Sequence, residues 1–151
     1  QRISNGENID QPDPFFRFIA AWVAFNALYN ALDSSRMLES GNDRDWAQVR
    51  AYANNKDAIA IHRGLITFQS DYRDAIQVLW KSGGVYDPVS GNYRVIKSAT
   101  PTLEHVLSCL YQIRCNLFHG GKTPTNLRDR KLVEAALTIT LRIVEGELGI
   151  E

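Results

Sequence analysis

Apolar residues recur three or four positions apart along most of this chain, which predicts helices. The clearest case is residues 14–34, where one broad face of the expected helix is apolar. Asp13 suits the cap of this helix and Pro14 its first position. Its apolar positions are Phe15, Phe18, Ile19, Trp22, Phe25, Tyr29 and Leu32. Because further apolar residues lie off this face, we expect the helix to be central and to contact several neighbours.

Four further helices are predicted, at about residues 45–53, 56–80, 100–118 and 127–148. Gly64 weakens the prediction of one unbroken helix over the second of these segments. Thr100-Pro101 opens the third segment, and Asn126 with Asp129 opens the fourth.

Glycines at positions 83 and 84 stop the helical pattern between the second and third of these segments. Residues 85–88 and 93–96 then flank a turn-rich stretch and predict a short β-hairpin. Its small size makes it an accessory element. We therefore predict an all-α fold, a bundle of four or five helices with a small β-hairpin insertion.

One polar residue falls inside the apolar stripe of the first helix. Asn26 lies between Trp22 and Tyr29, where a buried amide needs hydrogen-bond partners. Two interpretations remain open, a structural hydrogen-bond anchor, which we favour, or part of a site.

The length of 151 residues predicts a single domain over residues 1–151, with residues 1–12 as a flexible N-terminal segment. No apolar run approaches the ~20 residues that a membrane helix needs, and the N-terminus has no apolar signal core. The one methionine is Met37, so we expect an initiator to precede Gln1. We predict a cytoplasmic protein that makes no membrane contact.

Cysteine usage agrees with that compartment. On one helix, Cys109 and Cys115 would be separated by ~9 Å of rise, whereas a disulfide needs Cα atoms within ~7 Å. Reduced thiols are therefore expected.

The charge balance limits the choice of partners. The chain has 17 Lys and Arg against 17 Asp and Glu, so it cannot attract polyanions through its net charge. Positive charge is concentrated locally at Lys122, Arg128, Arg130 and Lys131. On charge alone this is a solvated helix start. Its position just after His119 makes RNA contact by Lys122, Arg128 and Arg130 the alternative.

Arg114 and His119 are the most informative pair of side chains. A guanidinium binds phosphate in a forked geometry, and an imidazole titrates near neutrality and can transfer a proton. Gly120-Gly121 ends the helix that carries the pair. On an ideal helix the two residues lie ~140° apart, so a shared site requires a long reach or a second subunit. From spacing alone, capping and packing roles are favoured for both.

Two metal or nucleotide interpretations fail on geometry. His105/Cys109 and Cys115/His119 are two i,i+4 pairs, but Cys109 and Cys115 lie ~120° apart around one helix, so the four residues cannot surround one zinc ion. We expect no metal, and we expect Cys109 to be a core residue. Gly121-Lys122-Thr123 lacks the earlier glycine and the preceding strand of a phosphate-binding loop. His62 and His105 are predicted to be surface or satisfied, partly buried residues.

The stretch from Ile113 to Lys122, with Arg114, Asn116 and His119, resembles the signature of the HEPN superfamily, an arginine and a histidine four to six residues apart near a helix end. Residues 15–29 look like the first helix of Apea-like and related prokaryotic members. Arg128-Asp129 followed by Leu132 resembles the start of their last helix.

This resemblance implies an all-α bundle that forms a homodimer with a composite active site. It implies metal-independent RNA cleavage that needs no cofactor and leaves a 2′,3′-cyclic phosphate and a 5′-hydroxyl. Arg114 would bind the phosphate, His119 would transfer protons, and Asn116 would be the orienting residue. Cys115 departs from the pattern, because active members commonly carry a polar residue there.

The expected function is a toxin or an antiviral defence effector that cuts RNA. The alternative is a non-catalytic HEPN-like dimerisation or binding module, fused to a further domain or paired with an antitoxin. A purely structural helical domain is the third interpretation.

Overall fold

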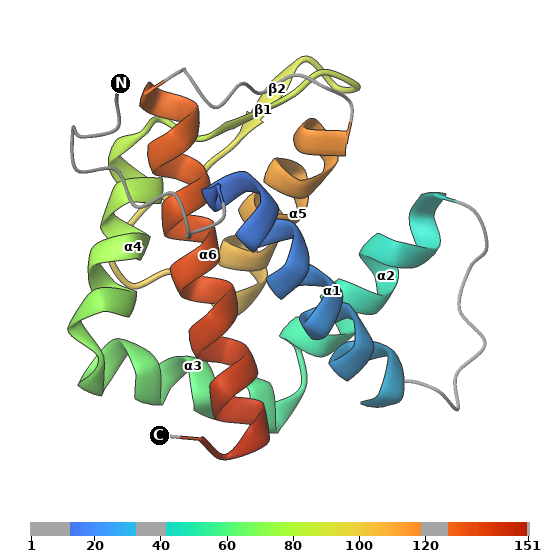
Figure 1. The fold of residues 1–151 in the computed structure, drawn as a ribbon, viewed down its shortest axis with the longest axis vertical. Helices are drawn as coiled ribbons and strands as arrows, with labels where there is room; N and C mark the ends of the chain where they lie inside the picture. Colours follow the sequence, from blue (N-terminus) through green and yellow to red (C-terminus); the bar gives the residue numbers. More distant parts are fainter. Residues whose placement is uncertain (1–12, 33–41, 119–126, 151) are drawn as a thin grey trace, which may run out of the picture.

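The computed structural model describes residues 13–32, 42–118 and 127–150 (Figure 1). The elements of these residues are α1 (Pro14–Leu32), α2 (Asn42–Ala53), α3 (Lys56–Phe68), α4 (Ser70–Lys81), β1 (Val85–Asp87), β2 (Asn92–Arg94), α5 (Leu103–Phe118) and α6 (Leu127–Leu148). The predicted all-α bundle with a small hairpin is confirmed. Within the described ranges, no helix has the length and apolar character to cross a membrane. The predicted N-terminal segment 1–12 lies outside the described residues.

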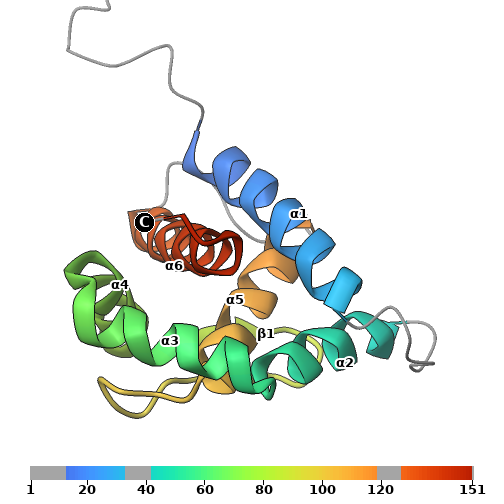
Figure 2. The ribbon, with the colours of Figure 1, turned by 90° about the horizontal axis from the view of Figure 1, so that it is seen from below.

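The central helix is α6 rather than α1. It packs against α1, α3, α4 and α5, and Figure 2 shows it between α1 on one side and the α3–α4 pair on the other. α1 contacts α2, α5 and α6, as its many apolar residues predict. Its outward face nevertheless carries Phe16 and Val23, which are 67% and 62% exposed. An apolar helix does not by itself reveal which of its faces is covered.

The segment predicted as one long helix is two helices. Gln69, with φ −115° and ψ 107°, is extended and separates α3 from α4. Gly64 remains inside α3, so the break lies five residues after the position that the sequence indicated. The Asn55 side chain caps α3 by accepting hydrogen bonds from the backbone N–H groups of Asp57 and Ala58.

His62 holds the corner between α3 and α4. Its Nε2 lies 2.9 Å from the carbonyl oxygen of Pro101, which can only accept, so Nε2 carries the proton. Nδ1, 2.8 Å from the Tyr72 hydroxyl, therefore accepts from it. Burial lowers the pKa of His62, more than the Pro101 hydrogen bond raises it, and Arg63 lowers it further. His62 is satisfied, as predicted, but it is fully buried rather than partly buried.

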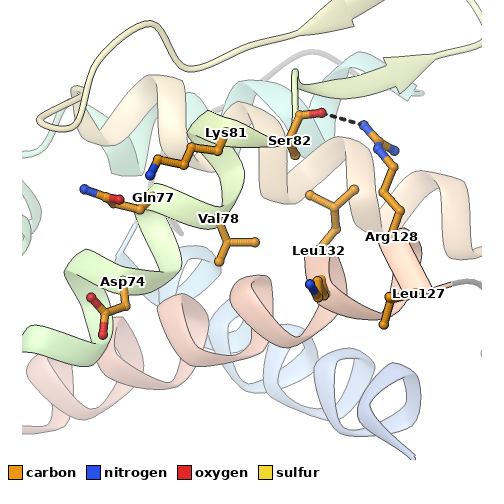
Figure 3. Close-up of a pocket in the computed structure, with 9 residues that line it drawn as sticks. Asp74, Gln77, Val78, Lys81, Ser82, Leu127, Arg128 and Leu132 are labelled. Carbon is orange, nitrogen blue, oxygen red and sulfur yellow. Dashed lines mark hydrogen bonds between the residues drawn. The ribbon is translucent and has the colours of Figure 1, made fainter.

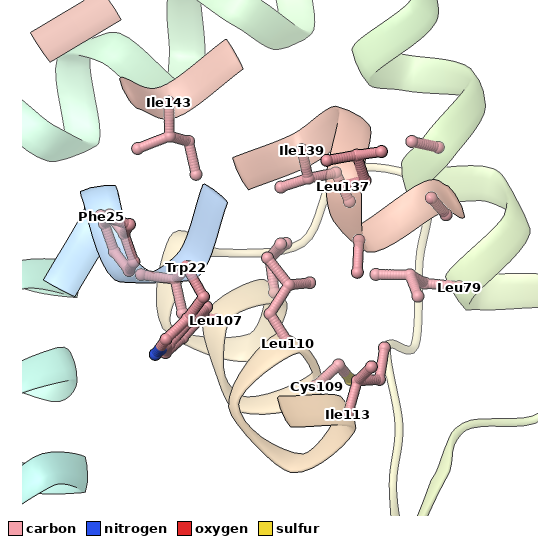
Figure 4. Packing of buried hydrophobic residues seen from close by; sticks show 14 of the residues in the cluster. Trp22, Phe25, Leu79, Leu107, Cys109, Leu110, Ile113, Leu137, Ile139 and Ile143 are labelled. Carbon is pink, nitrogen blue, oxygen red and sulfur yellow. The ribbon is translucent and has the colours of Figure 1, made fainter. Parts of the chain in front are cut away.

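The core lies where α1, α5 and α6 meet (Figure 4). Trp22 and Phe25 of α1 are buried together with Leu107 and Leu110 of α5. Cys109 is also buried, and its thiol donates a hydrogen bond to the Arg94 carbonyl at 3.4 Å, which confirms it as a core residue. Replacing one of the large apolar side chains with alanine costs roughly 2–5 kcal/mol in such an environment.

The hairpin occupies the end of the bundle at which α4 and α5 end and α6 begins (Figure 1). β1 and β2 are antiparallel, with Val85 opposite Arg94. Gly84 leads into β1 with φ +105°, and a Cβ there would lie 2.7 Å from the Arg94 carbonyl oxygen. Only glycine fits this position without a shift of the backbone. α5 begins at Leu103, slightly later than predicted, because the Thr102 hydroxyl accepts the His105 N–H and caps it.

Candidate functional site

Arg114 lies in the last part of α5, four residues before the final helical residue Phe118. Its guanidinium carbon is 4.9 Å from the centre of the Phe118 ring and 5.8 Å from that of Tyr111. These cation–π contacts hold the side chain while it remains 27% exposed. The helix end therefore presents a positioned guanidinium at the surface.

The hydrogen-bonding capacity of Arg114 is only partly used by the described residues. Its Nη2 is 3.7 Å from Asp45 Oδ2, which is an ion pair longer than a hydrogen bond. Its Nη1 is 4.0 Å from the Cys115 sulfur, and its Nε is buried without a hydrogen-bond partner there. A guanidinium in this state retains donors for an added oxyanion.

Two tyrosines border this guanidinium, and both remain protonated at neutral pH. Burial above all, together with the nearby Cys115 and Asp45 and against a lowering by Arg114, raises the pKa of Tyr111 to about 12. Burial and Asp45 also raise the pKa of Tyr29, against a lowering by Arg114. Neither phenol can serve as a base here. A base for this site must come from another residue.

Asn116 is buried, and both ends of its amide are engaged within the fold. Its Oδ1 accepts from Gln112 Nε2 at 2.9 Å, and its Nδ2 donates to the Tyr86 carbonyl at 2.9 Å. The second bond joins α5 to β1. The predicted orienting residue thus fixes the hairpin against the helix that carries Arg114.

Arg128 also fastens the hairpin. Its Nη2 donates to the carbonyls of Ser82 at 3.2 Å and Gly84 at 2.8 Å, and the Ser82 bond is drawn in Figure 3. Arg130 lies 3.9 Å from Glu134 and is 45% exposed. The two arginines predicted to contact RNA are both exposed, but Arg128 is bound to backbone carbonyls, whereas Arg130 lies near a carboxylate.

Two predicted site residues, His119 and Lys122, lie outside the described residues. The described part of α5 ends at Phe118, directly before His119 in the sequence. Asn26, predicted as a structural anchor, is half-buried and accepts a hydrogen bond from Asn30 Nδ2 at 3.0 Å within α1. Among the described residues, this hydrogen bond joins positions of one helix rather than two elements.

A groove of about 610 Å³ lies between α4 and the start of α6 (Figure 3). Its lining combines cationic and apolar side chains, namely Lys81, Arg128, Lys131, Val78, Leu127 and Leu132. Among the described residues, no group of three His, Cys, Asp or Glu side chains could hold a metal ion.

Sequence reasoning missed Asp45 of α2, which forms an ion pair with Arg114, and two residues that extend the contacts of Tyr111 to other elements. Trp46 of α2 lies 5.4 Å from Tyr111, and Arg94 of β2 lies 5.7 Å from the Trp46 ring. Neither residue belongs to a recognisable motif, so only the fold brings them to α5. Comparison with protein-family models, curated proteins and solved structures finds no match to this chain.

Proposed function

We propose that this chain is a metal-independent endoribonuclease of the HEPN type, with Arg114 and His119 as its catalytic residues. The observation that carries the proposal is the state of Arg114. Its guanidinium is held by Tyr111 and Phe118 at a helix end, partly exposed, and has no carboxylate within hydrogen-bond distance among the described residues. Arg128, by contrast, directs its donors at backbone carbonyl oxygens.

The chemistry follows from the two side chains. One imidazole takes the proton of the ribose 2′-hydroxyl as its oxygen attacks phosphorus. The bond from phosphorus to the 5′-oxygen breaks, and a protonated imidazole donates its proton to that leaving oxygen. Arg114 stabilises the charge that develops on the phosphate oxygens. The products are a 2′,3′-cyclic phosphate and a 5′-hydroxyl, so no metal or cofactor takes part.

Two chains supply the acid and the base in this proposal. A single helix end provides one imidazole, whereas a dimer provides two His119 and two Arg114. A cytoplasmic toxin or antiviral defence effector is the expected setting, with an antitoxin or a fused domain as the partner.

The test is cleavage of single-stranded RNA by purified protein in the presence of EDTA. We expect cleavage, products whose 5′ ends accept phosphate from a kinase without prior phosphatase treatment, and no cleavage of a substrate with 2′-deoxyribose. His119→Ala should abolish the activity while the dimer persists in light scattering. His105→Ala is the matched control, because His105 is an exposed histidine of α5. Cleavage that survives His119→Ala would disprove the assignment.

One observation favours the alternative, a non-catalytic binding module. Asn116 has both ends of its amide engaged inside the fold, and Cys115 cannot supply the paired donor and acceptor of an amide. The same experiment separates the two functions. A wild-type protein that forms dimers and binds RNA or a protein partner without cutting RNA supports the binding module.

A further inference from the structure

Two cationic and three aromatic side chains, with Arg114 among them, lie in successive contact. The guanidinium of Arg94 lies 5.7 Å from the Trp46 ring, and the Trp46 ring lies 5.4 Å from the Tyr111 ring. The Arg114 guanidinium then lies 5.8 Å from Tyr111 and 4.9 Å from Phe118. We call these five residues the cation–aromatic row.

The row crosses three elements that the fold brings together. Arg94 belongs to β2, Trp46 to α2, and the other three residues to α5. Figure 2 shows α2, α5 and the hairpin on the same side of the bundle, and α5 contacts both of the others. No segment of the sequence contains the pattern, which exists only after folding.

A packing role accounts for part of the row. Trp46 and Tyr111 are half-buried against the core, so their rings also stabilise the contact between α2 and α5. Packing alone, however, does not explain why other side chains of the row remain exposed to solvent. Phe118 is 61% exposed, and the side chains of Arg94 and Arg114 keep 29% and 27% of their surface in solvent.

The hairpin holds Arg94 in place at its end of the row. Arg94 Nη1 donates to Ser108 Oγ of α5 at 2.9 Å, and its Nη2 lies 3.5 Å from Asp87. Asn116 fastens the neighbouring strand to α5 through the Tyr86 carbonyl. The second cation is therefore fixed relative to Arg114 before any ligand arrives, which lowers the entropic cost of binding.

We propose that the cation–aromatic row is the binding track for the single-stranded RNA that adjoins the cleaved phosphate. The inference rests on the proposed function and extends it to the way the substrate is held. An unpaired strand alternates phosphates and bases, and proteins bind such strands by combining cations with aromatic stacking platforms. Arg114 and Arg94 bind two phosphates, Phe118 stacks on an unpaired base, and the edges of Trp46 and Tyr111 line the track between them.

A duplex does not satisfy this arrangement, because its bases are paired and stacked on one another. The row thus predicts a preference for single strands without a requirement for a particular sequence. Net charge cannot supply such a preference, since the chain is neutral overall. The local order of charges and rings supplies it.

The test measures binding in the full chain with His119→Ala, so that RNA is not consumed. A fluorescently labelled single-stranded RNA and the matching duplex are titrated by anisotropy. Phe118→Leu keeps apolar volume and removes the ring, and we expect the Kd for the single strand to rise about 5-fold or more. Phe118→Trp should retain tight binding.

Arg94→Gln should weaken binding and reduce the dependence of log Kd on log salt concentration by about one ionic contact. Arg94→Lys should keep the salt dependence, and it serves as the second variant if loss of the charge disturbs the hairpin. Arg63→Gln is the matched control, because Arg63 is an exposed cation of α3 outside the row. Its Kd and salt dependence should equal those of the parent protein.

Failure of this inference is distinguishable from failure of the proposed function. Unchanged single-strand binding in folded Phe118→Leu and Arg94→Gln overturns the track, even if the wild-type protein cleaves RNA. Equal affinity for duplex and single strand overturns it as well. If the row variants lose binding but the wild-type protein never cleaves, the track stands and the catalytic proposal fails.

Discussion

His62 and Arg114 both pack against tyrosine rings, yet their polar atoms are used in opposite ways. His62 is 4% exposed, and each ring nitrogen has one hydrogen-bond partner, the Tyr72 hydroxyl and the Pro101 carbonyl. Arg114 keeps about a quarter of its side chain in solvent and has an Nε without a partner among the described residues.

The difference teaches that residue type alone does not identify a site. Histidine is the commonest general base of enzymes, but a neutral ring with both nitrogens bonded has no capacity left for a substrate. An arginine held by rings and a distant carboxylate keeps that capacity. The comparison predicts opposite responses to mutation at the two positions.

The largest effect is expected at Arg114. Arg114→Ala should lower kcat for RNA cleavage by about 100-fold or more, because a donor to the developing charge is lost. Arg114→Lys should retain only a small part of the wild-type kcat, since an ammonium lacks the forked donor geometry. Denaturant unfolding should show a free energy of unfolding within about 1 kcal/mol of wild type for both variants. A large loss of stability with normal cleavage per folded molecule would show that Arg114 is a structural rather than a catalytic residue.

His62→Ala is expected to act on stability instead. The substitution leaves the buried Pro101 carbonyl and Tyr72 hydroxyl without partners and opens a cavity at the corner of α3 and α4. We expect the free energy of unfolding to fall by roughly 2–4 kcal/mol in urea titrations. Cleavage per folded molecule should stay at the wild-type rate. A variant that is fully stable but inactive would place His62 in the catalytic machinery.

Tyr72→Phe sharpens the same comparison with a smaller change. It removes the hydroxyl that donates to His62 Nδ1 and keeps the ring, which is fully buried. We expect a loss of about 1–2 kcal/mol in the free energy of unfolding, the cost of one unpaired buried acceptor. The double variant with His62→Ala should lose less than the sum of the single losses, because the two residues share one interaction.

The smallest expected effect is on the pH dependence of stability. Burial lowers the pKa of folded His62, so the unfolded chain binds the extra proton more readily. The stabilisation by neutral His62 is complete above the ordinary histidine pKa of ~6.5 and is lost as pH falls towards the folded value. Unfolding at several pH values should show a larger loss on acidification for wild type than for His62→Ala. Equal losses of stability in the two proteins would contradict a neutral His62 ring in the folded state.

Helix positions could be predicted wherever the signals are local. Asp13 and Pro14 mark the start of α1, whose first turn is capped by the Asp13 carboxylate at 2.6 Å from the Phe15 nitrogen. The bounds predicted for the last helix, residues 127–148, are those of α6. Both cases depend on residues within one or two turns of the helix end.

The break at Gln69 could not be predicted from local sequence signals. Apolar residues continue at helical spacing on both sides of it, although Phe68, which follows this spacing, is 81% exposed at the corner. What stabilises the corner is His62, bonded to Tyr72 and to a carbonyl 39 residues further along the chain. Contacts between residues so far apart in the sequence leave no local sequence pattern.

The candidate site also combines features that local sequence signals predict with features that they do not. The placement of Arg114 near the end of a helix followed from the glycines after it. The partners of Asn116 and Arg128 did not, because they are backbone carbonyls 30 and 44 residues away, which any residue type could provide. Arg94 and Trp46 carry no motif, and their relation to Arg114 depends on the packing of α2 and the hairpin against α5.

The two cysteines give the molecule a selective site for chemical labelling. Cys109 is 1% exposed, and burial raises the pKa of its thiol to about 11, so reagents at neutral pH reach it slowly. Cys115 is only half-buried and adjoins Arg114 in the sequence. In the dimer that we propose, a nitroxide attached there would report on the spacing between the two copies. Pulsed electron paramagnetic resonance would then measure how far apart the two halves of the proposed composite site lie in solution.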